Sequence, residues 1–339
     1  MKREPCATAG PLAVLEDGER NRMWLRDDPV EFAARLQDLR RQHGAVLVRG
    51  LRFDAPAPLE GIARSICRGM DLLSYDGERA TPRTSLGGRV YTSTEYKAGE
   101  SIFVHNECSS RLEWPLCLMF ACGVAASAGG ATPLVDMRQV TRELDADIQA
   151  QFAERGITYT RNYGGEFGVS LEYAFGTTDP AVIEAYCAAR GIACEWLGPE
   201  SLRTRFRRAA HALHPETGER LWFNYATFYS RSALEPRLRR LLRGVPEEKR
   251  AFSAAWGDGE PIADDVFDQC RAALDAATHR FAWQRGDFLL LDNMLSGHGR
   301  DPFQGERLTY TVMAGEVVRP EPMALATVLR AAKEETLSC

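Results

Sequence analysis

The sequence predicts a mainly β protein with additional helices (α+β), organised as one sheet-based domain that carries a helix-rich insertion. Strand-like apolar runs occur near both ends of the chain, at 45–49 and again at 288–291 and 308–312. Between them, residues 138–280 are dominated by helical patterns with interspersed strands. With 339 residues, 45% of them hydrophobic and 26% charged, the chain can bury a large core.

The N-terminal elements follow from helix capping and periodicity. Residues 1–27 are charged and contain proline, which favours either a poorly ordered arm or an extension at the edge of a sheet. Asp28 and Pro29 then begin a helix that ends at Gly44, because Asp caps the N-terminus, Pro suits the first turn and Gly permits the exit. The apolar face of this helix comprises Phe32, Leu36 and Leu39. The run at 45–49 is predicted as a short buried strand.

The remaining elements lie on either side of the insertion and within it. Further strand-like segments are Arg89–Thr92, Ser101–Glu107 and Leu116–Ala121. The loop Ala126–Thr132 turns the chain, and a helix is expected to begin after Asp136. Within the insertion, Leu221–Phe228 is predicted as a strand. The main domain is expected to span residues 28–320, followed by a C-terminal tail at 321–339.

Composition and charge exclude several classes of protein. The formal net charge of −5 argues against a dedicated nucleic-acid binder. No apolar run reaches the roughly 18 residues that a membrane span requires, so no membrane association is expected. Nine scattered cysteines form no C-x-x-C pair and no secretory leader is recognisable, which together predict a reduced, cytoplasmic protein. None of these features predicts the oligomeric state.

Two arginine-dense stretches, at 203–208 and 237–243, have two interpretations. The favoured one is a solvated helix face with its leucines turned inward, as Leu238, Leu241 and Leu242 suggest. The alternative is a docking surface for an acidic partner. Nucleic acid is disfavoured as that partner, because aromatic residues do not alternate with the arginines.

The chain lacks the short motifs of phosphate-loop NTPases, zincins, α/β-hydrolases and simple Rossmann enzymes. A different pattern, His105-Asn106-Glu107, falls on a predicted strand, where residues two apart point to the same face. An imidazole and a carboxylate aimed at one point form two thirds of the facial triad that holds non-haem Fe(II). On its own, however, such a pair is more often a half-buried histidine beside a neighbouring acid.

The other candidate ligands are few, since the chain has only six histidines. The strand at 288–291 leads to His298, which glycines flank on both sides, and Arg307 opens the next strand. A guanidinium there can bind a carboxylate through two hydrogen bonds, although a turn histidine and a surface ion pair are the alternatives. The spacing of His211 and His214 could form a second metal site, but the His-Pro turn favours a structural or substrate-lining role for His214.

Taken together, the motifs resemble the taurine dioxygenase and clavaminate synthase-like family of Fe(II)- and 2-oxoglutarate-dependent oxygenases. Within it, the chain is similar to the branch with a His-Asn-Glu motif, which includes amino-acid hydroxylases such as the syringomycin aspartyl hydroxylase. The resemblance runs in family order from about residue 44 to residue 315. The segments that carry it are Gly44–Gly50, Pro82–Thr84, Val90–Glu95, Ile102–Glu107 with Trp114-Pro115, Gly129–Asp136, His214–Gly218 with Trp222–Asn224, Trp256–Gly259, and Trp283–Arg307.

The resemblance implies a double-stranded β-helix (jelly-roll) core with the helix-rich insertion as a lid. It implies that His105, Glu107 and His298 bind Fe(II), and that Thr132 and Arg307 bind the carboxylate of 2-oxoglutarate distal to the metal. A glutamate as the third metal ligand matches the clavaminate synthase side of the family and departs from the His-x-Asp pattern of taurine dioxygenase.

The substrate residues also follow from the resemblance alone. Tyr91, Ser93 and Glu95 lie on the segment that approaches the substrate in this family, and Asn224 is expected near the site. Glu95 is a candidate partner for a substrate amine, and the alternative is a strand-edge acid that faces water. The resemblance also makes a phosphopantetheinyl (acyl or peptidyl) carrier protein a candidate for the acidic partner.

We therefore expect a dioxygenase that uses Fe(II), 2-oxoglutarate and O2 to hydroxylate an unactivated C–H bond of an amino acid or amino-acid derivative in specialised metabolite biosynthesis. The substrate is either free or bound to a carrier protein. Retention of Glu107 argues against halogenation, because halogenating relatives replace this carboxylate with a small residue. The nearest alternative is desaturation, cyclisation or C–C cleavage with the same cofactors. A non-catalytic jelly-roll binding protein and a zinc hydrolase are more distant alternatives.

Overall fold

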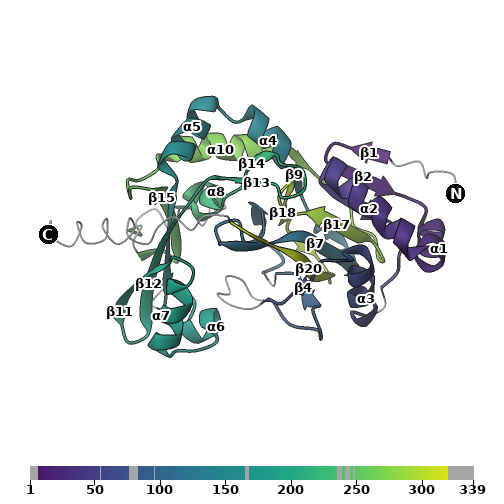
Figure 1. Cartoon of the computed structure of the whole chain (residues 1–339), viewed down its shortest axis with the longest axis horizontal. Helices are drawn as coiled ribbons and strands as arrows, with labels where there is room; N and C mark the ends of the chain where they lie inside the picture. Colours follow the sequence, from purple (N-terminus) through teal and green to yellow (C-terminus); the bar gives the residue numbers. More distant parts are fainter. Residues whose placement is uncertain are drawn as a thin grey trace.

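The computed structural model describes residues 7–53, 55–75, 83–94, 96–164, 168–234, 239–240, 245–246 and 249–319. These residues form a mixed α/β fold. A central pair of sheets lies between the N-terminal helices, on the right in Figure 1, and the third sheet with α6 and α7, on the left. None of the described helices is long and apolar enough to cross a membrane.

The described strands form three sheets and two short antiparallel pairs. The main sheet has the order β1-β2-β3-β17-β7-β20-β4, with β5 beside β20. Its strands are β1 (Ala7–Ala9), β2 (Leu12–Leu15), β3 (Ala45–Val48), β4 (Leu72–Leu73), β5 (Tyr91–Thr92), β7 (Glu113–Val124), β17 (Phe288–Asp292) and β20 (Leu308–Val318). The second sheet comprises β16 (Thr278–His279), β9 (Leu134–Asp136), β18 (Ser296–Arg300) and β6 (Ile102–His105), in that order. The third, within the insertion, comprises β11 (Ala193–Gly198), β12 (Ser201–Arg208), β10 (Ile157–Tyr163) and β15 (Phe252–Trp256). The short pairs are β13 (His211–Leu213) with β14 (Arg220–Trp222), and β8 (Ala128–Gly129) with β19 (Phe303–Gln304).

The helices cover the ends and faces of these sheets. Three of the described helices lie before residue 67: α1 (Gly18–Asp27), α2 (Pro29–His43) and α3 (Ala57–Ile66). The others lie between residues 137 and 276: α4 (Met137–Glu143), α5 (Ala146–Arg155), α6 (Leu171–Phe175), α7 (Pro180–Ala188), α8 (Ala226–Tyr229), the 3-10 turn η1 (Arg231–Ala233) and α10 (Asp264–Ala276). In Figure 1, α4, α5 and α10 lie together above the sheets, and α6 and α7 lie against the third sheet.

Helix α2 begins and ends where the sequence predicts. The side chain of Asp28 accepts a hydrogen bond from the backbone of Glu31 at 3.0 Å, and Pro29 occupies the first turn. At the other end, Gly44 has φ of 87°, a conformation that is strained for residues with a Cβ. The helix buries its predicted apolar face, Phe32, Leu36 and Leu39, against the main sheet.

Strand β17 is the centre of the main sheet, because it pairs with β3 on one side and β7 on the other. All five of its residues are buried, which explains its continuous apolar sequence rather than an alternating one. Alternate residues face opposite cores: Phe288 and Leu290 pack with α2, whereas Leu289 and Leu291 pack with Leu134 of the second sheet. The two sheets therefore share an apolar interface.

The prediction of a poorly ordered N-terminal arm is wrong for the described residues 7–27, and the alternative of an edge extension describes them. Strand β2 pairs in parallel with β3, from Leu12 opposite Ala45 to Leu15 opposite Val48. All four β2 residues are buried, so this short apolar run gains enough burial to fix it at the sheet edge. A domain boundary at residue 28 would divide one sheet. The tail at 321–339 lies outside the described residues.

The interpretation of 203–208 as a helix face is also wrong, because this stretch lies in strand β12. Alternate residues are buried there, from Leu202 through Thr204 and Phe206 to Arg208. This is the period of two that defines a strand, and the density of arginines obscures it in the sequence. Most of the second stretch, 237–243, lies outside the described residues.

The predicted strand at 221–228 is correct only for its first residues. Strand β14 ends at Trp222, and α8 begins at Ala226. The side-chain oxygen of Asn224 accepts a hydrogen bond from the backbone of Ala226 at 3.0 Å, which turns the chain out of the strand.

A buried polar network joins the end of β17 to α2. The side chains of Arg40, Asp292 and His214 are all fully buried. Arg40 donates to Asp292 and to Glu216, and Asp292 Oδ2 also lies 3.0 Å from His214 Nε2. His214 Nδ1 accepts from the backbone of Glu216 and of Thr217 at 3.1 Å, so both ring nitrogens are used. His214 therefore has a structural role.

We predict that Arg40→Met lowers the free energy of unfolding by about 3–5 kcal/mol, because it leaves the carboxylate of Asp292 buried without its cation. Urea unfolding followed by circular dichroism measures the effect. The matched control is Arg26→Met at the exposed Arg26–Asp27 pair, which should leave the free energy of unfolding nearly unchanged because water screens that pair. Equal losses in the two variants would contradict the prediction.

Candidate active site

The three predicted metal ligands lie together at the edge of the second sheet. His105 of β6 and His298 of β18 are directly paired residues of adjacent antiparallel strands. Glu107 follows β6, and its Oε2 lies 3.9 Å from His105 Nε2 and 4.0 Å from His298 Nε2. The candidate ligand atoms of the three side chains lie within 4.8 Å of one another, and all three side chains are less than a tenth exposed.

The backbone around Glu107 is fixed by Asn293, the residue that follows β17. The side chain of Asn293 is fully buried, and its Oδ1 accepts from the backbone N–H of Glu107 at 2.7 Å. Its Nδ2 donates to the carbonyl oxygens of Glu107 and Pro115, both at 2.9 Å. Asn106 in turn donates to the carbonyl of Asn293 at 2.6 Å. One amide thus joins the ends of β17, β6 and the start of β7.

The hydrogen bond of His105 leaves its Nε2 available for a metal. His105 Nδ1 lies 2.8 Å from the carbonyl of Phe103, so this nitrogen carries the proton and Nε2 keeps its lone pair. Burial lowers the pKa of both His105 and His298, the latter well below its usual range. Both rings are therefore neutral at pH 7, which is the form that binds metals.

Arg83 is a site residue that the sequence reasoning did not single out. It donates from Nη2 to Glu107 Oε2 at 2.7 Å, and its side chain is 3% exposed. Burial alone would raise the pKa of Glu107, but Arg83 and the two histidines hold it at about 2. Arg83 belongs to the segment Pro82–Thr84 that the family resemblance includes, which was the available signal.

The two predicted 2-oxoglutarate residues line a small cavity together with both histidines and Ser93. Thr132 Oγ1 accepts a hydrogen bond from Trp283 Nε1 at 3.0 Å, and Arg307 Nε donates to the carbonyl of Gly130 at 3.2 Å. Burial lowers the pKa of Arg307 to about 10, so the guanidinium remains charged at pH 7. The structure thus brings an arginine and a hydroxyl to the metal-ligand cluster.

The structure places the predicted substrate residues in different surroundings. Ser93 lines the small cavity, as described above. Tyr91 is buried in the core and accepts a hydrogen bond from the backbone of Tyr75 at 3.0 Å, so it supports a cavity wall rather than forming one. Asn224 lies near His105, but its amide nitrogen donates to the carbonyl of Ala210 at 3.0 Å and serves the local turn. Glu95 lies outside the described residues.

A larger cavity of about 570 Å³ opens beside the ligand cluster. The insertion supplies much of its wall, which includes Arg161, Phe206, Tyr225, Phe228, Tyr229 and Phe252. Phe228 and Tyr225 pack on the ring of His105, with centroid distances of 5.1 Å and 5.6 Å. This volume is within the range of about 300–1,000 Å³ for small-molecule sites. The cavity places a bound molecule next to the metal ligands.

We predict that Asn293→Leu weakens Co(II) binding by about 10–100-fold, because the Glu107 backbone loses the amide that fixes it. Anaerobic titration followed by visible absorption measures the affinity. The control is Asn21→Leu: Asn21 is equally buried and its amide also bonds two carbonyls, those of Leu15 and Arg49, but far from the site. Both variants lose stability, and only Asn293→Leu should lose metal affinity.

We predict that Mn(II) affinity falls by clearly less than about tenfold between pH 7 and pH 6. Burial lowers the pKa of His105 and His298 below the ordinary value, so the two rings gain fewer protons in this range than ordinary histidines would. Two histidines with ordinary pKa values near 6.5 would instead lose roughly tenfold in affinity over the same interval. Calorimetric titration at both pH values distinguishes the two cases, and a tenfold decrease would contradict the prediction.

Comparison with known proteins agrees with this site. Residues 17–313 match the family described as taurine catabolism dioxygenase TauD, TfdA family. The dapdiamide synthesis protein DdaC of Enterobacter agglomerans is 37% identical over 273 residues, which cover 80% of this chain and 82% of DdaC. A clavaminate synthase-like protein of Arabidopsis thaliana is 30% identical over 283 residues, with the same two coverages, 80% and 82%.

Solved structures show the same fold at low sequence identity. The PvcB protein of Pseudomonas aeruginosa aligns with a TM-score of 0.54 at 15% identity, covering 91% of this chain and 88% of PvcB. A putative alpha-ketoglutarate-dependent taurine dioxygenase of Burkholderia xenovorans aligns with a TM-score of 0.53 at 14% identity, covering 94% of each chain. On the family match and the two curated relatives, the chain belongs to the TauD/TfdA family and is an iron- and 2-oxoglutarate-dependent dioxygenase.

Proposed function

We propose that this dioxygenase hydroxylates an unactivated C–H bond of an amino acid or amino-acid derivative, with iron held by His105, Glu107 and His298. The observation that carries the proposal is the convergence of these three side chains beside a cavity large enough for such a substrate. Two imidazoles and one carboxylate are the donor set of the facial triad, which leaves three metal positions for other ligands.

The described residues fit the iron ion. The Nε2 atom of each histidine faces the same carboxylate oxygen, and His298 Nδ1 is buried without a hydrogen-bond partner in the described part of the chain. When bound, Fe(II) with 2-oxoglutarate supplies O2 activation coupled to decarboxylation of 2-oxoglutarate to succinate. The protein excludes water with the aromatic wall around His105 and orients the substrate from the insertion side.

Arg307 and Thr132 are the residues that hold the carboxylate of 2-oxoglutarate distal to the metal. Both line the small cavity that also touches the two histidines. A charged guanidinium binds a carboxylate through two hydrogen bonds, and a hydroxyl adds a third. Gly130 makes this approach possible: its φ is 70°, and a Cβ there would lie 3.2 Å from Arg307 Cδ.

The jelly-roll core and its insertion also remain a proposal. We infer that the main sheet and the sheet β16-β9-β18-β6 are the two halves of a double-stranded β-helix, with 138–280 inserted as the lid. The apolar cluster that Leu134 of β9 forms with Leu289 and Leu291 of β17 supports this, because it lies between the two sheets.

Several properties outside the metal centre complete the proposal. A role in specialised metabolite biosynthesis is supported by similarity to DdaC, which is a dapdiamide synthesis protein.

The described cysteines, from Cys67 to Cys270, are all free, which fits a reduced cytoplasmic setting. A carrier protein remains a candidate partner, although Arg203 and Arg205 lie within ion-pair distance of Glu195, which reduces the charge that 203–208 offers.

Retention of Glu107 as a ligand candidate argues against halogenation. Desaturation, cyclisation and C–C cleavage use the same metal and co-substrate, so the ligand cluster does not separate them. The mass of the product does: hydroxylation adds one oxygen atom, whereas desaturation or ring closure removes two hydrogens.

The test of the proposal is anaerobic titration of the purified protein with Fe(II) and 2-oxoglutarate, followed by the weak visible charge-transfer band. We predict that His298→Ala and Glu107→Ala abolish the band. Arg307→Gln should keep metal binding but weaken 2-oxoglutarate binding by about tenfold or more, since it loses a charge-assisted hydrogen-bond pair. The control is Arg280→Gln, at an exposed arginine paired with Asp301. Retention of the band in both ligand variants would show that the proposed triad is wrong.

A further inference from the structure

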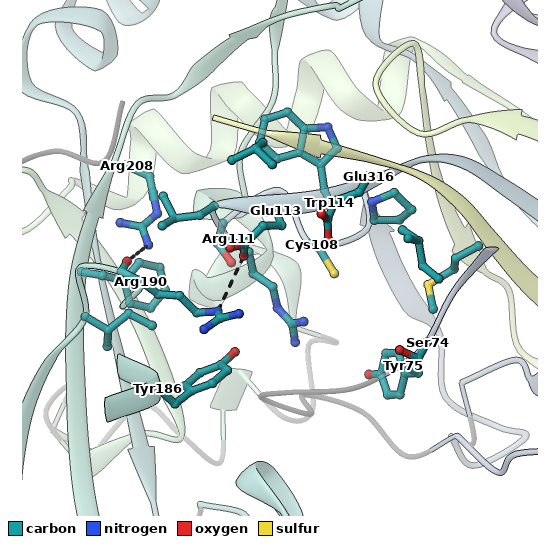
Figure 2. Close-up of a pocket in the computed structure, with 18 residues that line it drawn as sticks. Ser74, Tyr75, Cys108, Arg111, Glu113, Trp114, Tyr186, Arg190, Arg208 and Glu316 are labelled. Atoms are coloured by element: carbon teal, nitrogen blue, oxygen red, sulfur yellow. Dashed lines mark hydrogen bonds and ion pairs between the residues drawn. The ribbon is translucent and has the colours of Figure 1, made fainter. Parts of the chain in front are cut away.

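The large space beside the metal ligands extends away from the residues that hold 2-oxoglutarate. The metal-side cavity of about 570 Å³ adjoins a second chamber of about 620 Å³, and Ser110 is one of the residues that line both. Figure 2 shows this second chamber, with Tyr186 and Arg190 on one side and Ser74 and Tyr75 on the other. A substrate bound in the metal-side cavity therefore obstructs the approach to the ligand cluster from this direction.

A separate cleft lies on the other side of the small cavity that Thr132 and Arg307 line. Its volume is about 220 Å³, which is room for several water molecules. The cleft shares Arg307 and Thr309 with the small cavity, whereas it shares no lining residue with the metal-side cavity. The small cavity in turn shares Arg83 and His105 with the metal-side cavity. The ligand cluster can thus be reached from two directions.

The outer end of the cleft is open to solvent. Ser127, Ala128 and Gly129 on one wall and Ala282 on another are exposed. Small residues, from Ala125 to Gly130, form much of the lining, so little side-chain volume projects into the cleft. A path therefore runs from solvent along this wall to the side chain of Arg307.

The inner end of the cleft is suited to a carboxylate. Arg307 is partly exposed there, and it is the only charged side chain among the described residues that line the cleft. It forms no ion pair within the described part of the chain, and its Nε donates to the carbonyl of Gly130. The hydroxyl of Thr309 is buried and has no hydrogen-bond partner among the described residues. An arriving carboxylate pairs with this guanidinium and can accept from this hydroxyl.

Trp283 connects the cleft wall to the co-substrate residues. Its ring lines the cleft, and its Nε1 donates to Thr132 Oγ1 at 3.0 Å. The cleft therefore ends at both residues to which we assign the carboxylate of 2-oxoglutarate distal to the metal. No acidic side chain of the described lining repels a dianion on the way.

The position of Arg307 also fits the direction of entry. A molecule that enters through the cleft advances with its oxo-acid end first, and its distal carboxylate comes to rest on Arg307 at the inner end. A molecule that enters from the metal-side cavity would have to carry its distal carboxylate past the ligand cluster before it could reach Arg307. The cleft therefore provides the shorter route, and it requires no reversal of the molecule.

We propose that this cleft is the passage through which 2-oxoglutarate enters and succinate leaves, separate from the cavity that the substrate occupies. The inference rests on the proposed function, since it takes Arg307 and Thr132 as the residues that hold the distal carboxylate. It assigns Arg307 and Thr309 to the inner end of the passage. Because the two routes are separate, a bound substrate does not obstruct exchange of the co-substrate.

The test compares exchange of 2-oxoglutarate in four alanine-to-tryptophan variants of the full chain. Ala282→Trp and Ala128→Trp each fill the outer part of the cleft. Ala233→Trp narrows the metal-side cavity instead. The control, Ala185→Trp, adds the same side chain at an exposed position of α7 that lines none of these spaces.

Association is measured anaerobically on the Fe(II)-loaded chain, from the growth of the charge-transfer band at low concentrations of 2-oxoglutarate. Dissociation is measured by displacement of isotopically labelled 2-oxoglutarate with the unlabelled compound. We expect each cleft variant to lower both rate constants by about tenfold, because an obstructed passage raises the barrier equally in both directions. The equilibrium affinity should therefore remain near that of the wild-type chain. Ala233→Trp and Ala185→Trp should exchange 2-oxoglutarate as the wild type does.

The outcomes are separable. Wild-type exchange rates in both cleft variants would overturn the inference. Equal slowing in Ala233→Trp would also overturn it, because the entrance would then lie on the substrate side. So would slower association with unchanged dissociation, which indicates a damaged binding site rather than an obstructed passage. Each of these results leaves the proposed function intact as long as the wild-type chain binds Fe(II) and 2-oxoglutarate. If the wild-type chain shows no band, the proposed function fails, and this inference fails with it.

Discussion

The side chain of Asn293 is the constraint on which the geometry of the site depends. It lies at the point where the main sheet ends and the chain turns toward β18, and its amide contacts the backbone on both sides of Glu107 and the carbonyl of Pro115. Three segments that are far apart in sequence are thereby held at one buried point. Because the amide is fully buried, water does not compete for these hydrogen bonds, and each is stronger than it would be at the surface.

Buried arginines set the electrostatics of the molecule at two different points. At Asp292 the cation of Arg40 neutralises a structural carboxylate, so that the end of β17 can be buried away from water. At Glu107 the cation of Arg83 keeps the carboxylate ionised in surroundings that would otherwise favour its protonation. Arg40 donates hydrogen bonds to two carboxylates, whereas two nitrogens of Arg83 have no hydrogen-bond partner among the described residues. This contrast separates a structural ion pair from one that can bind a ligand.

The sequence was sufficient for the parts of the fold that obey local rules. Helix α2 has its cap, its apolar face and its terminal glycine within one continuous segment, and the apolar strand β17 is recognisable from composition alone. The ligand cluster was accessible because His105 and Glu107 are two residues apart and the family resemblance supplied His298. Arg83 and Asn293 were not singled out, because their roles depend on contacts across 24 and 186 residues of sequence. Strand β12 was misjudged because arginine occupies four of the six positions 203–208, which hides an alternating pattern.

Strand β12 also determines how the cavity can change during evolution. Its inward residues, Phe206 and Arg208, form cavity wall, and the intervening Arg205 and Arg207 face the other side of the sheet. A strand has only two faces, so inserting or deleting one residue before this segment would exchange the two sets completely. Phe206 and Arg208 would be exchanged for two arginines on the cavity wall in a single step, while the metal ligands on β6 and β18 would remain in place. Substrate preference in this fold can therefore shift abruptly through the insertion without any change in the chemistry of the metal centre.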